Sequence, residues 1–147
     1  MFSKILVPID VDYPETAAAV YRKAADLARL CRAQLRLASV MPGFGMPIVS
    51  SYITDEIRRE TAQRMQQSME EFIAAYCDQP VHYSLATGKN WHEVIKIADH
   101  WGADLIIVYY NYHCEFNEVF SDSCSKKIVD QAKCSVLKLR NVFDDQA

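Results

Sequence analysis

A phosphate-binding loop is the first chemistry to test in this sequence, because a buried-strand pattern at 104–108 is followed by a connection that leads into a helical pattern. In many α/β proteins such a connection is rich in glycine, and its backbone amides hold phosphate oxygens. Here residues 108–123 read VYYNYHCEFNEVFSDS, without a glycine and with five aromatic residues from Tyr109 to Phe120. The position suits a phosphate site, whereas the residue types do not.

The other reactive side chains do not form a catalytic or metal-binding pattern. His113, Cys114 and Glu115 are adjacent, but no spaced Cys/His pair accompanies them, which argues against a metal site. No nucleophile, base and oxyanion-binding group can be combined, so we predict no catalytic residues and no enzyme activity. The five cysteines are widely spaced and form no CxxC motif, so we expect reduced thiols rather than disulfides.

Length and charge restrict the class of protein. A chain of 147 residues fits one domain, and a hydrophobic fraction of 50% is enough for a core. The 16 basic and 19 acidic residues give a net charge of -3, which argues against a nucleic-acid-binding surface. No apolar run reaches the roughly 18 to 20 residues that cross a membrane. Because Met1-Phe2-Ser3 leads directly into a strand pattern, we expect no signal peptide and a cytoplasmic protein.

Strand and helix patterns alternate along the chain. Strands are expected at 4–10, 34–41, 81–85, 104–110 and 134–140. Helices are expected between them, with side-chain caps at Asp12 and Asn90, a long apolar stripe over 53–76, and a last helix opened by Ser121 or Ser123. This alternation predicts an α/β fold with a five-stranded, mostly parallel sheet and helices on both faces.

Three segments of the chain resemble the universal stress protein family. They are KILVPID at 4–10, GADLIIV at 102–108 and QAKCSVLKLR at 131–140, which are similar to the family's first, fourth and fifth strands in the right order. The resemblance covers nearly the whole chain. It implies a Rossmann-like fold of the adenine nucleotide α-hydrolase type, with one domain over 1–141 and a polar tail at 142–147.

The resemblance also implies a homodimer that forms by pairing the last strands of two subunits. In this sequence Val136, Leu137 and Leu139 form an apolar, strand-forming edge that would aggregate unless it were covered. Self-pairing across a twofold axis covers such an edge. We therefore expect a homodimer through 134–140.

Many members of this family bind ATP through the motif G-x2-G-x9-G-[ST], and the spacing of that motif is intact here. With GADLIIV as the anchor, its positions fall on Tyr109, Tyr112, Asp122 and Ser123, so only the serine remains. Glycine lets the backbone approach phosphate oxygens and adopt positive φ, which tyrosine does not. Asp122 adds a charge penalty, because a carboxylate about 5 Å from a phosphate charge repels it by about 3 kcal/mol at an effective dielectric near 20. We therefore predict that no ATP cofactor binds.

Three positions keep an alternative open, namely a sensor of adenine nucleotides or nucleosides that binds ATP or AMP. By the resemblance, Asp10 corresponds to an aspartate near the adenosine and Val40 to a strand position whose backbone contacts the adenine. With Ser123 they form a degenerate site. Each residue also has a structural interpretation, since Asp10 can accept amides in a turn, Val40 can pack in the core and Ser123 can cap a helix.

The aromatic residues from Tyr109 to Phe120 have two interpretations. They either fill the emptied nucleotide cleft and cover the open end of the sheet, or form a surface that contacts a protein partner. Neither interpretation requires catalysis.

Overall fold

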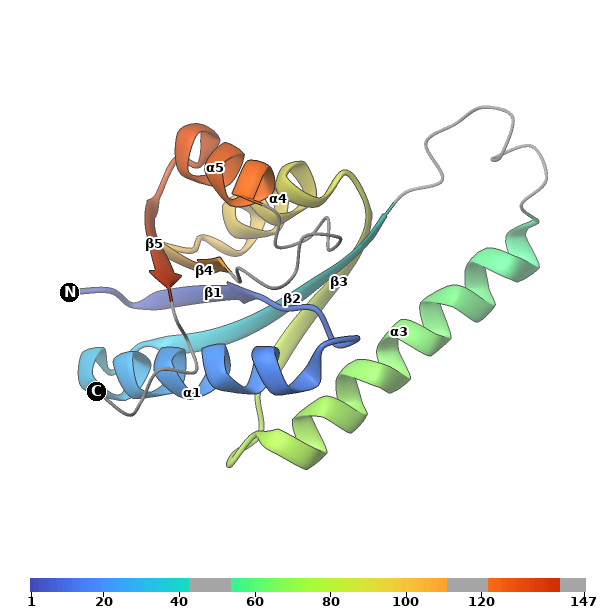
Figure 1. Cartoon of the computed structure of the whole chain (residues 1–147), viewed down its shortest axis with the longest axis horizontal. Helices are drawn as coiled ribbons and strands as arrows, with labels where there is room; N and C mark the ends of the chain where they lie inside the picture. The colour runs from blue at the N-terminus through green and yellow to red at the C-terminus, as the bar shows by residue number, and fades with distance from the viewer. Residues whose placement is uncertain (43–53, 111–121, 141–147) are drawn as a thin grey trace.

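The computed structural model describes residues 1–42, 54–110 and 122–140, and within these ranges strands and helices alternate (Figure 1). The elements are β1 (Lys4–Pro8), α1 (Pro14–Cys31), β2 (Gln34–Pro42), α3 (Asp55–Tyr76), β3 (His82–Gly88), α4 (Asn90–Trp101), β4 (Leu105–Tyr110), α5 (Asp122–Gln131) and β5 (Ser135–Arg140). The predicted α/β fold with five strands is confirmed. Within the same ranges, no helix is both long and apolar enough to cross a membrane.

The strands form one sheet in the order β3-β2-β1-β4-β5, and every neighbouring pair is parallel. The order reverses between β1 and β4, because β2 and β3 lie on one side of β1 while β4 and β5 lie on the other. The third strand lies at one edge of the sheet, and it extends to Gly88, beyond the expected range of 81–85. The sheet therefore has one switch point, at the end of β1.

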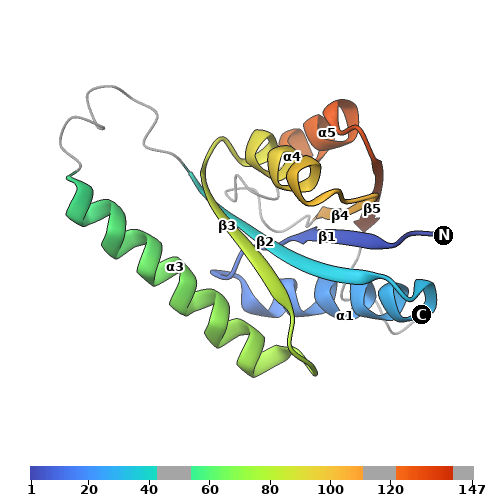
Figure 2. The ribbon, with the colours of Figure 1, turned by 180° about the vertical axis from the view of Figure 1, so that it is seen from behind.

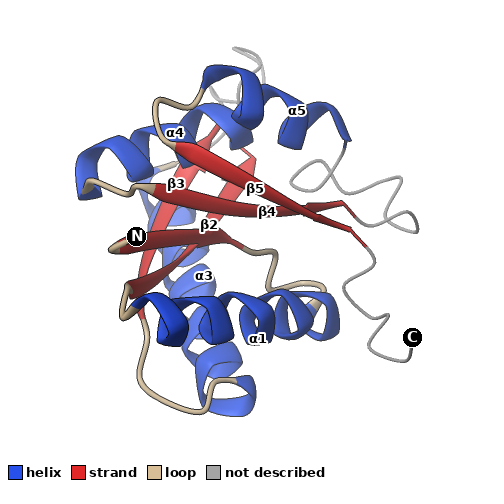
Figure 3. Ribbon diagram, turned by 90° about the vertical axis from the view of Figure 1, so that its left-hand side faces the viewer, coloured by secondary structure: helices blue, strands red, loops and turns tan. Residues whose placement is uncertain are grey.

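Helices cover both faces of the sheet, with α1 and α3 on one side and α4 and α5 on the other (Figure 3). Successive strand residues point to opposite faces. In β4, for example, Ile107 belongs to the buried cluster beneath α1, whereas Ile106 and Val108 belong to the cluster beneath α4 and α5. Strands buried on both faces explain why β1 and β4 are apolar almost throughout.

Helix α3 differs from the other helices because only its second half is buried. Its buried residues are Met65, Met69 and Phe72, and the helix extends past the sheet with its first turns away from the other elements (Figure 2). The helix begins with a cap at Thr54, whose hydroxyl accepts the Ile57 amide at 3.2 Å. Packing therefore holds one half of α3, and local interactions hold the other.

Two predicted helix caps are wrong. Tyr13, not Asp12, precedes α1 and makes no side-chain capping hydrogen bond, and Pro14 is the first helical residue. Lys89 precedes α4, so Asn90 is already inside that helix, where only 8% of it is exposed. Helix α4 ends at Gly102, whose φ of 81° is left-handed and whose amide donates to the Ala98 carbonyl at 2.9 Å.

Candidate functional site

The candidate site lies where β1, β2 and β4 end, beside the switch point in strand order. Ligands of open α/β sheets bind at this position. The Ile9 amide donates to the Ala38 carbonyl at 2.8 Å, so contact between β1 and β2 continues just beyond β1. Asp10 is the next residue, so it lies just beyond the end of β1, beside the switch point in strand order.

The carboxylate of Asp10 organises the turn between β1 and α1. Its Oδ1 accepts the Asp12 amide at 2.9 Å, and its carbonyl accepts the Tyr13 amide at 3.1 Å. Asp12 therefore contributes its backbone amide to this turn. It lies one residue before Tyr13, which is the residue that precedes α1. Asp10 itself is half-buried, so its side chain combines a structural role with a position at the switch point.

Val40 lies in the last part of β2, and its side chain is core. Only 4% of the residue is exposed, and it belongs to the same buried cluster as Leu6 and Val108. In the sheet Val40 pairs with Ala86 of β3. Any contact between Val40 and a ligand must therefore use the backbone, as the family resemblance implies.

Ser123 is exposed and is the second residue of α5. The prediction that Ser123 caps this helix is wrong, because a capping residue precedes the first helical residue, which is Asp122. The next residue, Cys124, packs in the cluster that contains Val40. The start of α5 therefore lies on the same side of the sheet as Val40, whereas the Asp10 turn leads into α1.

Tyr109 occupies the first glycine position of the ATP motif, and the structure places it in β4. It pairs with Leu139 of β5, and 1% of it is exposed. Among the described residues, positive φ occurs at Arg32, Gly88 and Gly102, so Tyr109 has no left-handed backbone. Its ring lies in the buried cluster beneath α1 and is therefore not available to a protein partner. The remaining loop, 111–121, lies outside the described residues.

The cysteines of the described ranges, Cys31, Cys77, Cys124 and Cys134, are free thiols in the structure. Burial raises the pKa of Cys77 and of Cys124 to about 11, so both stay protonated and weakly nucleophilic at neutral pH. No group of three His, Cys, Asp or Glu side chains in this part of the chain could hold a metal ion. His113, Cys114 and Glu115 lie outside it.

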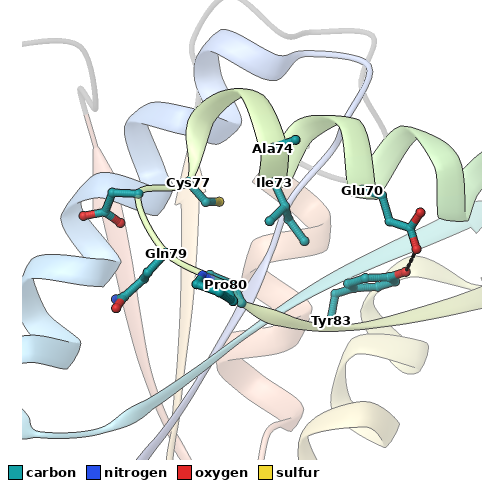
Figure 4. A pocket seen from close by; sticks show the side chains of 9 residues that line it. Glu70, Ile73, Ala74, Cys77, Gln79, Pro80 and Tyr83 are labelled. Carbon is teal, nitrogen blue, oxygen red and sulfur yellow. Dashed lines mark hydrogen bonds between the residues drawn. The ribbon is translucent and has the colours of Figure 1, made fainter.

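Two hollows at the opposite end of the sheet were not predicted. The first is a groove of about 490 Å³ between the end of α3 and the start of β3, where Ile73 and Cys77 face Pro80 (Figure 4). At one end of this groove the Tyr83 hydroxyl donates to Glu70 Oε1 at 3.0 Å. Its walls are largely apolar.

The second hollow, of about 520 Å³, is positively charged. We call it the arginine pocket, and its principal side chains are Arg29, Arg32, Arg36, His82 and Trp101. A signal for it exists in the sequence, since Arg36 stands between two leucines inside a strand pattern. The sequence gives no such signal for Arg32. Its left-handed backbone, with φ at 55°, depends on where α1 ends.

The sequence model of the universal stress protein family matches residues 1–140. The chain belongs to this family. No curated protein matches it in a direct comparison of sequences.

Solved structures with the same fold include two of universal stress proteins. The hypothetical protein MJ0577 is 21% identical with a TM-score of 0.72, and the match covers 95% of this chain and 96% of that one. A universal stress protein in complex with cAMP is 16% identical with a TM-score of 0.59, covering 95% and 97%. One from Archaeoglobus fulgidus in complex with dAMP is 18% identical with a TM-score of 0.54, covering 92% and 96%. At these identities the likeness concerns the fold.

Proposed function

We propose that this universal stress protein is a cytoplasmic, homodimeric stress-response protein that does not bind ATP and is not an enzyme. The observation that carries this proposal is the burial of Tyr109 at the position of the motif's first glycine. Strand pairing with β5 continues through Tyr109 and Tyr110, where the phosphate-binding loop of ATP-binding members would begin. The backbone there is engaged in the sheet instead of being free to turn toward a triphosphate.

The start of α5 adds an electrostatic argument. Asp122, at the third glycine position, is the first residue of α5. The amino end of a helix attracts negative charge, and a phosphate often supplies it. Residue 122 is an aspartate where the motif has glycine, so the sequence adds a negative charge at this position, which disfavours a phosphate.

A second candidate function is a sensor of adenine nucleotides that carry a single phosphate. It is supported by the related structures with cAMP and dAMP. Asp10 and the backbone of Val40 lie at the ends of adjacent strands, and neither depends on the glycine loop. A ligand held mainly through its nucleoside needs less of the phosphate-binding surface that Tyr109 and Asp122 replace.

The dimer in this proposal uses β5, which is an edge strand of the sheet. Leu137 is 40% exposed, and Val136 and Leu139 are half-buried, so this edge retains apolar surface that a second subunit would cover. The proposed domain spans 1–141, with 142–147 as a tail.

Calorimetric titration distinguishes the two functions. Dialysed protein would be titrated with ATP and Mg²⁺, AMP, cAMP and adenosine, and native mass spectrometry would show whether a nucleotide copurifies. We expect no heat with ATP; binding in the micromolar range would refute the principal proposal. Binding of AMP or cAMP that Asp10→Asn abolishes and Asp12→Asn preserves would favour the sensor. Asp12→Asn is a matched control because Asp12 contributes its backbone amide to this turn.

A further inference from the structure

The arginine pocket lies at the amino ends of β2 and β3, opposite the strand ends that form the candidate nucleotide site. It is bordered by the end of α1, the start of β3 and the end of α4, which contribute Arg32, His82 and Trp101 respectively. Its volume of about 520 Å³ is in the range of sites for small-molecule ligands. Charge, rather than apolar surface, distinguishes it from the groove beside α3.

Arg36 has an unusual environment for a half-buried cation. Its Nη1 donates to Ser84 Oγ at 3.0 Å and to the Tyr83 carbonyl at 3.4 Å, which are neutral acceptors. Its guanidinium lies 5.1 Å from the centre of the Trp101 ring, and Lys4 Nζ lies 5.6 Å from the same centre. Its Nε is buried and has no hydrogen-bond partner. No ion pair joins Arg36 to a carboxylate within the described ranges.

This environment leaves a positive charge only partly compensated. A buried charge is expensive unless it is paired, and a buried donor without an acceptor adds a further cost. The Trp101 ring offsets part of the charge but is shared with Lys4. An oxyanion in the pocket would supply the missing negative charge beside this guanidinium.

Arg32 provides the second, independent observation. It ends α1 in the left-handed conformation, with φ at 55°, and is the single non-glycine residue with positive φ in the described ranges. Glycine is the usual residue at this position of a helix end, because it has no Cβ. A positive charge complements the carbonyl end of α1, but Arg29 in the last turn already provides one.

The two arginines near the end of α1 differ in their partners. Arg29 pairs with Asp26 and with Asp78, the latter at 3.2 Å. Arg32 is exposed, lines the pocket and forms no ion pair in the part of the chain that the structure describes. Arg32 and Arg36 are therefore the arginines of this pocket that no carboxylate pairs in the described ranges.

We propose that the arginine pocket binds a small molecule through an oxyanion group, a phosphate or a carboxylate, which Arg36 and Arg32 hold. Guanidinium groups present several donors in one plane and match such groups in a bidentate manner. The site is distinct from the nucleotide site and does not depend on whether that site is functional.

The test is a nuclear magnetic resonance titration of the full chain, labelled with ¹⁵N. Sodium pyrophosphate and sodium citrate would be added separately at constant ionic strength, to distinguish a phosphate from a carboxylate ligand. We expect the Arg36 Nε–H and Trp101 indole signals to shift and saturate with at least one anion below about 10 mM. Absence of any shift at these two groups with both anions would overturn the proposal.

Substitution of Arg36 tests the assignment. Arg36→Met should weaken binding about tenfold or more, which is the usual effect of losing a hydrogen bond between charged groups. Arg36→Lys keeps the charge but lacks the planar donors and should weaken binding as well. Arg58→Met removes the same charge from the exposed half of α3 and should leave binding unchanged. Equal affinity in wild type, Arg36→Met and Arg58→Met would mean an adventitious ion only and would overturn the proposal.

Arg32→Gly gives a result that a merely structural role does not predict. Glycine should relieve the left-handed backbone, so the melting temperature should rise while the affinity for the anion falls several-fold. A higher melting temperature with unchanged affinity would remove Arg32 from the site. Because this variant is expected to be more stable than wild type, loss of binding would not reflect loss of folding.

Discussion

The variant Tyr109→Ala tests the feature on which the proposed loss of ATP binding depends. Tyr109 is 1% exposed and lies in the core beneath α1. A buried tyrosine removes roughly 150–250 Å² from water, which at about 25 cal/mol per Å² corresponds to about 4–6 kcal/mol. Because alanine retains part of this contribution, the free energy of unfolding should fall by about 3–5 kcal/mol. For a chain of this size, the melting temperature should fall by about 10 °C.

Chemical denaturation followed by far-UV circular dichroism measures this loss. Tyr13→Ala is a matched control, because Tyr13 is 43% exposed and makes no side-chain capping bond at α1. The control should lose less than about 1 kcal/mol, as surface substitutions usually do. If Tyr109→Ala lost no more than the control, the ring would not be part of the core. The argument that β4 continues through the start of the ATP loop would then fail.

Three further perturbations follow from the structure. Gly102→Ala should cost about 1 kcal/mol in a thermal melt, because φ is 81° while no atom lies closer than 4.0 Å to an added Cβ; an unchanged melting temperature would contradict this. The Tyr21 hydroxyl, 2.8 Å from Asp78, is the main reason that the pKa of Asp78 is lowered, with a smaller contribution from Arg29. The hydrogen bond to the ionised Asp78 carboxylate stabilises the folded state. This stabilisation is complete above the unfolded-state pKa of about 3.9 and is lost as pH falls through the lower folded-state pKa. The difference in free energy of unfolding between wild type and Tyr21→Phe, measured by urea denaturation, should therefore be constant near neutral pH and become smaller in acid. A difference that becomes larger in acid would contradict this reasoning. Leu137→Lys should shift the protein from dimer to monomer in light scattering, because it places a charge on the exposed edge of β5, and a dimer of undiminished stability would exclude this interface.

Patterns of apolar residues were sufficient to predict the fold, because each strand and helix buries a regular set of side chains. They did not determine where helices begin. At α1 the choice of cap depends on the turn before it, and the Asp10 carboxylate already accepts the Asp12 amide there. At α4 the helix starts one residue earlier than the Asn90 pattern predicted, so that side chain is buried instead of capping.

The candidate site was predictable only in part, because burial and contacts between distant residues are not visible in local sequence patterns. The match to the ATP motif identified Tyr109, and the strand expected at 104–110 already included it, as β4 does. The sequence did not show that its ring is buried beneath α1, since aromatic residues suit both cores and surfaces. The arginine pocket depends on residues that are distant in sequence, such as Arg32, Arg36 and Trp101. The left-handed backbone of Arg32 runs against residue preference, so sequence patterns would place glycine or asparagine there.

The uneven burial of α3 has a consequence for hydrogen exchange. Its first turns depend on the Thr54 cap and on Asp55 and Glu56 at the positive end of the helix, whereas Met65, Met69 and Phe72 attach the later turns to the core. Amide protons of the first turns should therefore exchange through local fraying, and those of the later turns only when the sheet itself opens. One continuous helix thus comprises two segments of different stability, with the boundary near Met65.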